Sequence, residues 1–280
     1  MEKILVPTDF SLNANKALDF AVQIARQAKA EIILIHACDL IDTIFKDNQT
    51  MYKEHNQTIC DKANENLSLL KKSIEDTEKL SVHIKLYRGN VTDTILQASE
   101  EHHADLVIMG TLGETRLQKK IFGSITAGII GKTNIPVMAI PLLSEWEIPE
   151  KIFLAVNNVD DQPDLFKAVF VMAELFDATV HLGIFTDADT AGAIDYLNDE
   201  RGIIAYEEKL NTLYKNSNIK YIHLDGHTFQ ETLEQYVLEK EIDILAMLTH
   251  KRTFVESIFN RSMTKKMSYY TRIPLLAIPA

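Results

Sequence analysis

The sequence has no excess of positive charge, and this absence limits the partners that the protein can have. Its 280 residues include 29 lysines and arginines against 40 aspartates and glutamates, for a formal net charge of −11. Non-specific binding to nucleic acid depends on Lys and Arg side chains that neutralise phosphates. The sequence contains no basic stripe of that kind, so we expect neither DNA nor RNA as a partner.

Long apolar runs and a leader are missing as well. No stretch reaches about 18 consecutive apolar residues, the length that a membrane-spanning helix needs. Met1-Glu2-Lys3 leads directly into the apolar run 4–6, without a basic segment or a small-residue cleavage site. We therefore expect no contact with a membrane and a cytoplasmic location.

Cysteine is scarce. Cys38 and Cys60 are the two in the chain, and neither belongs to a C-x-x-C pair of the kind found in redox or zinc sites. This usage fits a reduced compartment. We interpret both as small, partly buried hydrophobic residues rather than redox-sensitive thiols.

The sequence does contain an internal repeat. Its first half closes on Thr-Asn-Ile-Pro-Val-Met-Ala-Ile-Pro at 133–141, and its second closes on Thr-Arg-Ile-Pro-Leu-Leu-Ala-Ile-Pro at 271–279. The openings match too, with Lys-Ile-Leu-Val from residue 3 and Lys-Ile-Phe-Leu from residue 151. The repeat predicts two domains, 1–141 and 151–280, joined by a polar linker at 142–150.

Within the first half, apolar strand-like runs alternate with helical stretches. The runs are continuous in Val, Ile and Leu, a pattern typical of parallel strands that helices cover on both faces. They lie at 3–7, 31–37, 82–87, 105–109 and 136–140. Helical spacing marks one core face within 12–28 and another at Ile59, Ala63, Leu67, Leu70 and Ile74. The predicted fold class is α/β, with one doubly wound parallel five-stranded sheet per half.

A glycine loop follows the fourth predicted strand. Residues 110–124 read G-x2-G-x9-G-S, between the strand and a short apolar helix at 124–132. The first glycine lets the chain turn, and the others allow backbone N–H groups to approach an anion. Ser124 opens the helix, where its hydroxyl, the first N–H groups and the helix dipole favour a phosphate. The alternative is a glycine-punctuated loop without a ligand.

Asp9 follows the first predicted strand as Gly110 follows the fourth. Ligands of doubly wound sheets bind beyond the carboxyl ends of the strands, where the winding reverses. If these two strands are neighbours there, the Asp9 carboxylate could accept hydrogen bonds from a ribose or an adenine amine. The alternative is that Asp9 caps the following helix.

These motifs together resemble a known family. The opening Lys-Ile-Leu-Val-Pro-Thr-Asp-Phe-Ser at 3–11, Ala-Asp-Leu-Val-Ile-Met-Gly-Thr at 104–111, the glycine loop and the closing motif resemble a universal stress protein domain of the ATP-binding type. The whole chain resembles a tandem member, with the universal stress protein or adenine nucleotide alpha-hydrolase-like fold.

The resemblance implies a ligand and a set of site residues. The ligand is ATP or another adenine nucleotide, and any Mg²⁺ would bridge its phosphates and water. Asp9 would contact the adenosine, Pro7 and Thr8 would shape that wall, Ala37 would line the adenine and Met109 would pack on the base. The ribose and phosphates would be held by Gly110, Gly113, Gly123, Ser124 and Ile125. The resemblance also implies that 136–140 pairs with 274–278 within one chain, and it leaves a homodimer open.

The second half departs from this pattern. In register with the first half, Leu248, Lys251 and Arg261 replace the three glycines, and Asn157 replaces Asp9, while Ser262 is retained. We therefore expect no nucleotide site of this type in 151–280. The cations of that loop could still hold an anion by charge, although exposed cations are usually only solvated.

Other motifs are weaker. Gly131-Lys132-Thr133 resembles the end of a Walker A motif, but the first glycine of that motif is missing and a helix precedes it, so we interpret Gly131 as a helix C-cap. A metal cluster at His223, Asp225 and His227 lacks a second ligand pair.

No nucleophile with a paired base emerges, so catalysis is unsupported and no catalytic residue is assigned. The sequence favours a stress-response or regulatory protein that binds an adenine nucleotide in its first domain. The alternatives are an enzyme that slowly hydrolyses ATP or transfers its adenylyl group, and a scaffold or small-ligand carrier with an apolar pocket at 187–206.

Overall fold

The computed structural model describes residues 1–38, 49–111, 123–156, 163–187, 204, 206–215, 217–249 and 272–279. The chain divides into two compact units, Met1–Leu142 and Leu143–Ala280. The predicted pairing of 136–140 with 274–278 stays a prediction. No helix in the described part of the chain is long and apolar enough to cross a membrane.

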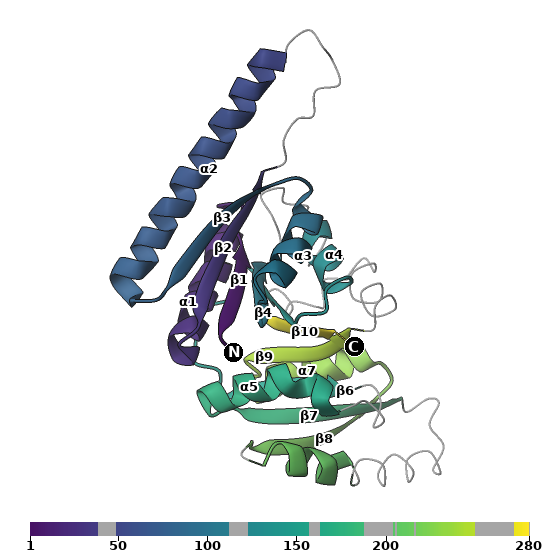
Figure 1. Ribbon diagram of the computed structural model, residues 1–280. Helices are drawn as coiled ribbons and strands as arrows, with labels where there is room; N and C mark the ends of the chain where they lie inside the picture. The colour runs from purple at the N-terminus through teal and green to yellow at the C-terminus, as the bar shows by residue number, and fades with distance from the viewer. Residues whose placement is uncertain are drawn as a thin grey trace. The chain divides into compact units, whose positions relative to one another are not determined.

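The first unit alternates strands and helices. Its elements are β1 (Lys3–Pro7), α1 (Leu12–Ala28), β2 (Glu31–Cys38), α2 (Gln49–Glu78), β3 (Val82–Arg88), α3 (Val91–Glu101), β4 (Leu106–Gly110), α4 (Ser124–Ile130) and β5 (Val137–Ile140). The strands are parallel, in the order β3-β2-β1-β4-β5, so the winding reverses between β1 and β4. Helices α1 and α2 cover one face of the sheet, and α3 and α4 cover the other (Figure 1).

The buried strands have the predicted composition and nearly the predicted bounds. Three residues of β1 and all four of β5 are fully buried, because helices cover both faces of the sheet. Helix α1 occupies the predicted residues: the Ser11 hydroxyl caps its start, and it ends at Lys29 in the left-handed conformation (φ 54°). Gly131 is the C-cap of α4, as predicted.

The predicted core face of α2 is wrong by one position at its first residue. Ile59 is 39% exposed, whereas Cys60 beside it is 3% exposed. The buried stripe is Cys60, Ala63, Leu67 and Ile74, with Leu70 half-buried at its edge. The small Cys60 faces the sheet where the larger Ile59 was expected.

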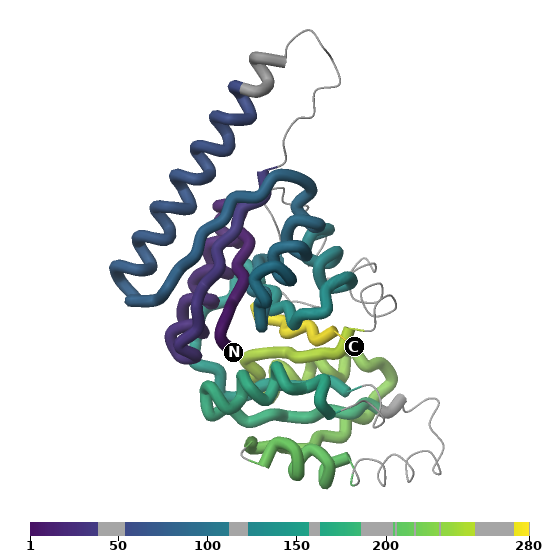
Figure 2. Tube along the Cα trace, in the orientation of Figure 1, coloured from purple at the N-terminus to yellow at the C-terminus, as the bar shows by residue number. Residues whose placement is uncertain are grey.

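The second unit has the same topology. It comprises β6 (Lys151–Val156), the 3-10 helix η2 (Pro163–Phe166), α5 (Lys167–Phe176), β7 (Thr179–Asp187), β8 (Ile219–Gly226), α7 (Phe229–Lys240), β9 (Ile244–Thr249) and β10 (Leu275–Pro279). Its strands are parallel in the order β8-β7-β6-β9-β10. The predicted fold class of two doubly wound parallel five-stranded sheets is therefore confirmed. Figure 2 traces the course of the chain through both units.

The repeat extends to single hydrogen bonds. Asp105 accepts from two backbone N–H groups at the start of β1 (2.6 and 3.0 Å), and Asp243 accepts from two at the start of β6 (2.9 and 2.8 Å). The helices α1 and α5 end at Lys29 and Asp177, both left-handed (φ 54° and 53°). The strand starts are thus bound by the same residue type in both halves, and the helix ends share a backbone conformation although their residues differ.

One glycine of the second unit is required for packing. A Cβ on Gly183 of β7 would lie 2.1 Å from the ring of Phe153 on β6. That ring packs against Tyr236 (5.3 Å between centroids), whose hydroxyl lies 2.9 Å from Nδ1 of the buried His181. Tyr236 therefore keeps the Phe153 ring from moving away from Gly183.

We expect Gly183→Ala to lower the free energy of unfolding by about 1–3 kcal/mol, because an added methyl overpacks this cluster. Urea unfolding followed by circular dichroism measures the loss. Shortening the opposing side chain in Gly183→Ala/Phe153→Leu should make the double variant more stable than the sum of the two single changes. Strict additivity would contradict the steric explanation.

Candidate functional site

A cavity of about 120 Å³ opens at the carboxyl ends of β1, β2 and β4. This volume is several times the roughly 10–15 Å³ that one water molecule requires, so the cavity has room for part of an organic ligand. Thirteen residues line it: Pro7, Thr8, Asp9, Ala14, Ile35, His36, Ala37, Val91, Ile95, Met109, Gly110, Ile125 and Thr126. It lies where the winding of the sheet reverses, the position at which such sheets bind ligands.

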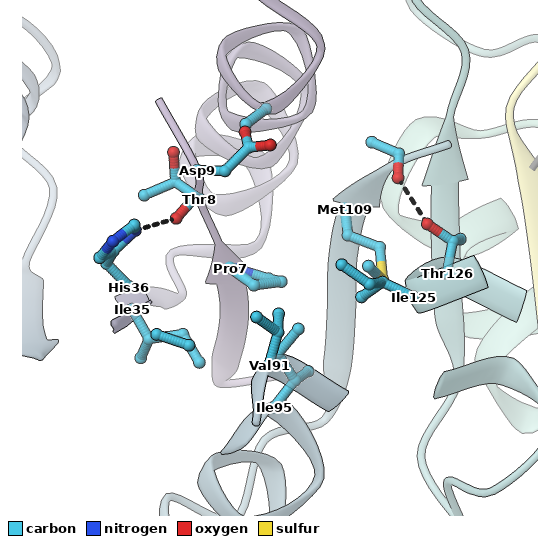
Figure 3. Close-up of a pocket in the computed structure, with 13 residues that line it drawn as sticks. Pro7, Thr8, Asp9, Ile35, His36, Val91, Ile95, Met109, Ile125 and Thr126 are labelled. Atoms are coloured by element: carbon cyan, nitrogen blue, oxygen red, sulfur yellow. Dashed lines mark hydrogen bonds between the residues drawn. The ribbon is translucent and has the colours of Figure 1, made fainter. Parts of the chain in front are cut away.

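The cavity has an apolar body and polar edges (Figure 3). Val91 and Ile95 project from the start of α3 toward Pro7, and Met109 lies beside Ile125 across from them (Figure 3). Thr8, Asp9 and His36 form one edge, while Thr126 lies at the other. Such a slot can bury a flat heterocycle and leave its polar substituents to the edges.

Asp9 is held at the rim by a local turn. Its Oδ1 accepts a hydrogen bond from the backbone N–H of Ser11 (3.0 Å). The cap of α1 is Ser11 itself, whose Oγ accepts from the N–H of Ala14 (3.2 Å). The alternative that Asp9 is the N-cap is therefore wrong, and its carboxylate lies exposed at the edge of the cavity.

The same edge is stiffened by Phe10 and His36. Nδ1 of His36 donates to the carbonyl oxygen of Thr8 (2.7 Å), because a carbonyl can only accept. The imidazole stacks on the ring of Phe10 (4.8 Å between centroids), which has a left-handed backbone (φ 62°). The Thr8 hydroxyl accepts from the N–H of Phe10 (3.0 Å). Thr8 and Phe10, the residues before and after Asp9, are thus held against β2.

Gly110 is needed for a different reason from the one predicted. Among the described glycines, Gly89 has the positive φ, so Gly110 does not use a left-handed turn. A Cβ on Gly110 would instead lie 2.7 Å from Oδ1 of Asn13 and 3.0 Å from its carbonyl oxygen. The missing side chain allows the first turn of α1 to lie directly on the end of β4.

The first turn of α4 is tied to the same strand end. The Thr126 hydroxyl donates to the carbonyl of Gly110 (2.9 Å), and the N–H of Gly123 donates to the carbonyl of Thr111 (2.6 Å). Gly123 is the N-cap of α4, in extended conformation (φ −70°, ψ 162°). Ser124 is the first helical residue and Ile125 reaches the cavity.

Seven of the ten predicted site residues line the cavity: Pro7, Thr8, Asp9, Ala37, Met109, Gly110 and Ile125. Gly123 and Ser124 lie next to it at the start of α4, and Gly113 lies outside the described residues. The lining residues that the sequence did not single out are Ala14, Ile35, His36, Val91, Ile95 and Thr126. The i, i+4 pair Val91 and Ile95, directly after the Asn90 cap, is the signal that could have assigned α3 to the site.

A sequence model of the universal stress protein family matches residues 1–141. The chain belongs to the universal stress protein family. Universal stress protein MJ0531 of Methanocaldococcus jannaschii is 27% identical over 139 residues, which are 50% of this chain and 81% of that protein. Universal stress protein MJ0577 of the same organism is 28% identical over 153 residues, covering 50% of this chain and 94% of that protein.

The fold likeness to solved universal stress proteins extends over both units. A crystal structure of a family member from Archaeoglobus fulgidus covers 99% of this chain and 96% of its own, with a TM-score of 0.69 and 17% sequence identity. At that identity the likeness is one of fold.

The second unit of this universal stress protein differs at the position of Gly110. The β4–β5 register pairs Gly110 with Ile140, and the β9–β10 register pairs Leu248 with Ile278, so Leu248 is the counterpart of Gly110. Its side chain is buried (1% exposed). The residues between β6 and Pro163, which correspond to the first turn of α1, are outside the described residues.

Other sequence-predicted features of the second unit are outside the described residues. They are Asn157, Lys251, Arg252, Arg261, Ser262 and nearly all of 187–206. His223, Asp225 and His227 lie at the end of β8 and just after it. In the part of the chain that the structure describes, no three His, Cys, Asp or Glu side chains come together as metal ligands.

The packing of Gly110 can be tested against a matched glycine. Gly110→Ala should lower the free energy of unfolding by about 1–3 kcal/mol, since Asn13 cannot yield without moving the start of α1. Gly128, inside α4, has its nearest contact with an added Cβ at 3.6 Å. Gly128→Ala should therefore be neutral or stabilising by about 0.5–1 kcal/mol. Equal urea midpoints for the two variants would refute this role of Gly110.

Proposed function

We propose that this universal stress protein is a regulatory protein whose first unit binds one adenine nucleotide, ATP or a related molecule, in the cavity between β1 and β4. The observation that carries the proposal is the pairing of an apolar slot with the exposed Asp9 carboxylate at the point where the winding reverses. An adenosine has both parts: a flat base to bury, and ribose hydroxyls that donate to a carboxylate.

Two features of the strand end fit such a ligand. At Gly110, which lines the cavity, the missing side chain makes room for Asn13, whose Oδ1 is buried and has no hydrogen-bond partner. An unpaired buried acceptor costs roughly 1–3 kcal/mol, so a donor from a ligand or its water would be stabilised there. The Asn13 amide itself lies 3.5 Å from the Thr111 hydroxyl.

In the proposed complex, each group of residues has a separate task. Met109 and Ile125 pack on one face of the base, and Pro7, Val91 and Ile95 pack on the other side of the slot. Asp9 accepts hydrogen bonds from the ribose. The phosphates extend toward Gly123 and Ser124, and Mg²⁺, when bound, is held by the phosphates and water.

The lining residues favour binding over turnover. Of the thirteen, Asp9 is the one carboxylate and His36 the one imidazole. Asp9 already accepts from Ser11, and Nδ1 of His36 is bound to the Thr8 carbonyl. Because both groups already bind the backbone, we expect ATP turnover far below the roughly 1–1,000 per second of typical enzymes.

Isothermal titration calorimetry of the full chain should give one ATP per chain. A stoichiometry near two would contradict the assignment to the first unit, since Leu248 is expected to exclude a ligand from the second. Brisk hydrolysis of ATP that a single carboxylate substitution abolishes would instead establish an enzyme.

Asp9→Ala should lower the affinity for both adenosine and ATP by roughly 10- to 100-fold, because each ligand loses the charge-assisted hydrogen bonds from its ribose to the carboxylate. The control is Asp76→Ala, which removes an exposed carboxylate on α2 and should leave both affinities unchanged. If Asp9→Ala left both affinities unchanged, the Asp9 carboxylate would not be part of the binding site.

Gly123→Val should abolish the advantage of ATP over adenosine and leave adenosine binding intact. The backbone at Gly123 (φ −70°, ψ 162°) is one that valine adopts readily, so the fold should survive while the side chain occupies the space of the phosphates. Equal loss of adenosine binding in this variant and in Asp9→Ala would show that the start of α4 does not specifically hold phosphate.

A further inference from the structure

The two cysteines of the chain meet in the fold. Cys38 is the last residue of β2 and Cys60 lies on α2, and their side chains are 1% and 3% exposed. Their thiols are within hydrogen-bonding reach of each other. They belong to one buried cluster with Ala63, against which Phe10 and Leu86 pack. Two cysteines that lie on different elements, a strand end and a helix, thus have their side chains in contact.

This thiol cluster touches the polar edge of the nucleotide cavity at two points. Cys38 directly follows Ala37, which lines the cavity. Phe10 directly follows Asp9, and its ring stacks on His36, which is bound to the Thr8 carbonyl. Any change in the distance between the two sulfurs therefore acts on residues that hold Asp9 and Ala37 in place.

We propose that Cys38 and Cys60 are a reversible disulfide site, oxidised by peroxides, and that the oxidised protein binds adenine nucleotide more weakly. One thiolate attacks the O–O bond of the peroxide, which gives a sulfenic acid and releases water. The second thiol attacks the sulfenic sulfur and displaces a second water. Two thiols and one hydrogen peroxide thus become one disulfide and two waters, and a dithiol reverses the change.

The direction of the effect follows from packing. A disulfide requires sulfurs about 2.05 Å apart, closer than two thiols in contact, so oxidation draws the sulfurs of Cys38 and Cys60 together. Phe10 packs against the cluster that contains both thiols, so a movement of the sulfurs changes the position of its ring. Its displacement misplaces Asp9.

The reaction should be slow at neutral pH. Burial, and next the Cys60 thiol, raise the pKa of Cys38 to about 11. Because the thiolate is the reactive form, the Cys38 thiol reacts slowly with peroxide near neutral pH. The oxidation experiment therefore needs incubation over hours rather than seconds.

The test begins with the full-length reduced chain, which is incubated with hydrogen peroxide, quenched with catalase, denatured and alkylated with N-ethylmaleimide. Intact mass spectrometry should show a monomer lighter by two hydrogens with no adduct, and dithiothreitol treatment before alkylation should restore two adducts. Two adducts after peroxide, or disulfide found only between chains, would overturn the proposal. This arm needs no nucleotide, so it stands apart from the proposed function.

The second arm measures ATP binding before and after oxidation, and it rests on the proposed function. The Kd should rise by about fivefold or more, the lower end of typical coupling between sites, and dithiothreitol should restore it. Diamide, which oxidises thiols and spares Met109, should have the same effect. An unchanged Kd in a chain shown to hold the disulfide would overturn the coupling.

Single-cysteine variants control for other oxidation. Cys38→Ser and Cys60→Ser cannot form the bond. Peroxide should therefore not cause, in either variant, the fivefold rise in the Kd for ATP that dithiothreitol reverses. Because serine adds a buried hydroxyl, Cys60→Ala provides a second variant that keeps the cluster apolar. A reversible loss of affinity in all three variants would assign the effect to another residue.

Discussion

The close contact between the start of α1 and the end of β4 is the constraint on which the first unit depends. It exists because residue 110 has no side chain, since a Cβ would lie 2.7 Å from the Asn13 amide oxygen. From this contact the chain continues to Thr111, and the Thr126 hydroxyl binds the Gly110 carbonyl from the other side. The helix after β1 and the helix after β4 are thereby set at fixed positions around one strand end, and the cavity is the space between them.

The second unit shows what happens when that constraint is changed. It keeps the strand order, the parallel registers and the carboxylate that binds the start of its first strand, yet Leu248 occupies the place of Gly110. The buried leucine side chain at this point, where the first unit has none, is the difference behind our proposal that the nucleotide binds in the first unit.

The polar edge of the cavity is built from short-range contacts that reach back into the core. Asp9 is held by Ser11, Thr8 by His36, and Phe10 by both His36 and the thiol cluster. These contacts connect the thiol cluster to the edge of the cavity at which we propose that the nucleotide binds.

The sequence by itself determined the elements, the repeat and most of the cavity. Strand bounds such as 3–7 and the helix 12–28 could be predicted because buried parallel strands and capped helices have strong local signals. The family motifs placed Asp9, Met109 and Gly110 together because each follows or ends a strand at the point of reversal.

Only the tertiary structure decided which side chains meet across elements. Val91 and Ile95 come to the cavity from α3, although no local pattern connects them to the other lining residues. Likewise, the contact with Asn13 is the reason that residue 110 is a glycine, and it is not visible in the sequence. Cys60 replaces Ile59 in the core because the rotation of α2 against the sheet is set by packing, which a stripe of apolar residues defines only to within one position. That rotation also brings Cys60 to Cys38, a contact that depends on how a strand end and a helix pack and that spacing along the chain cannot encode.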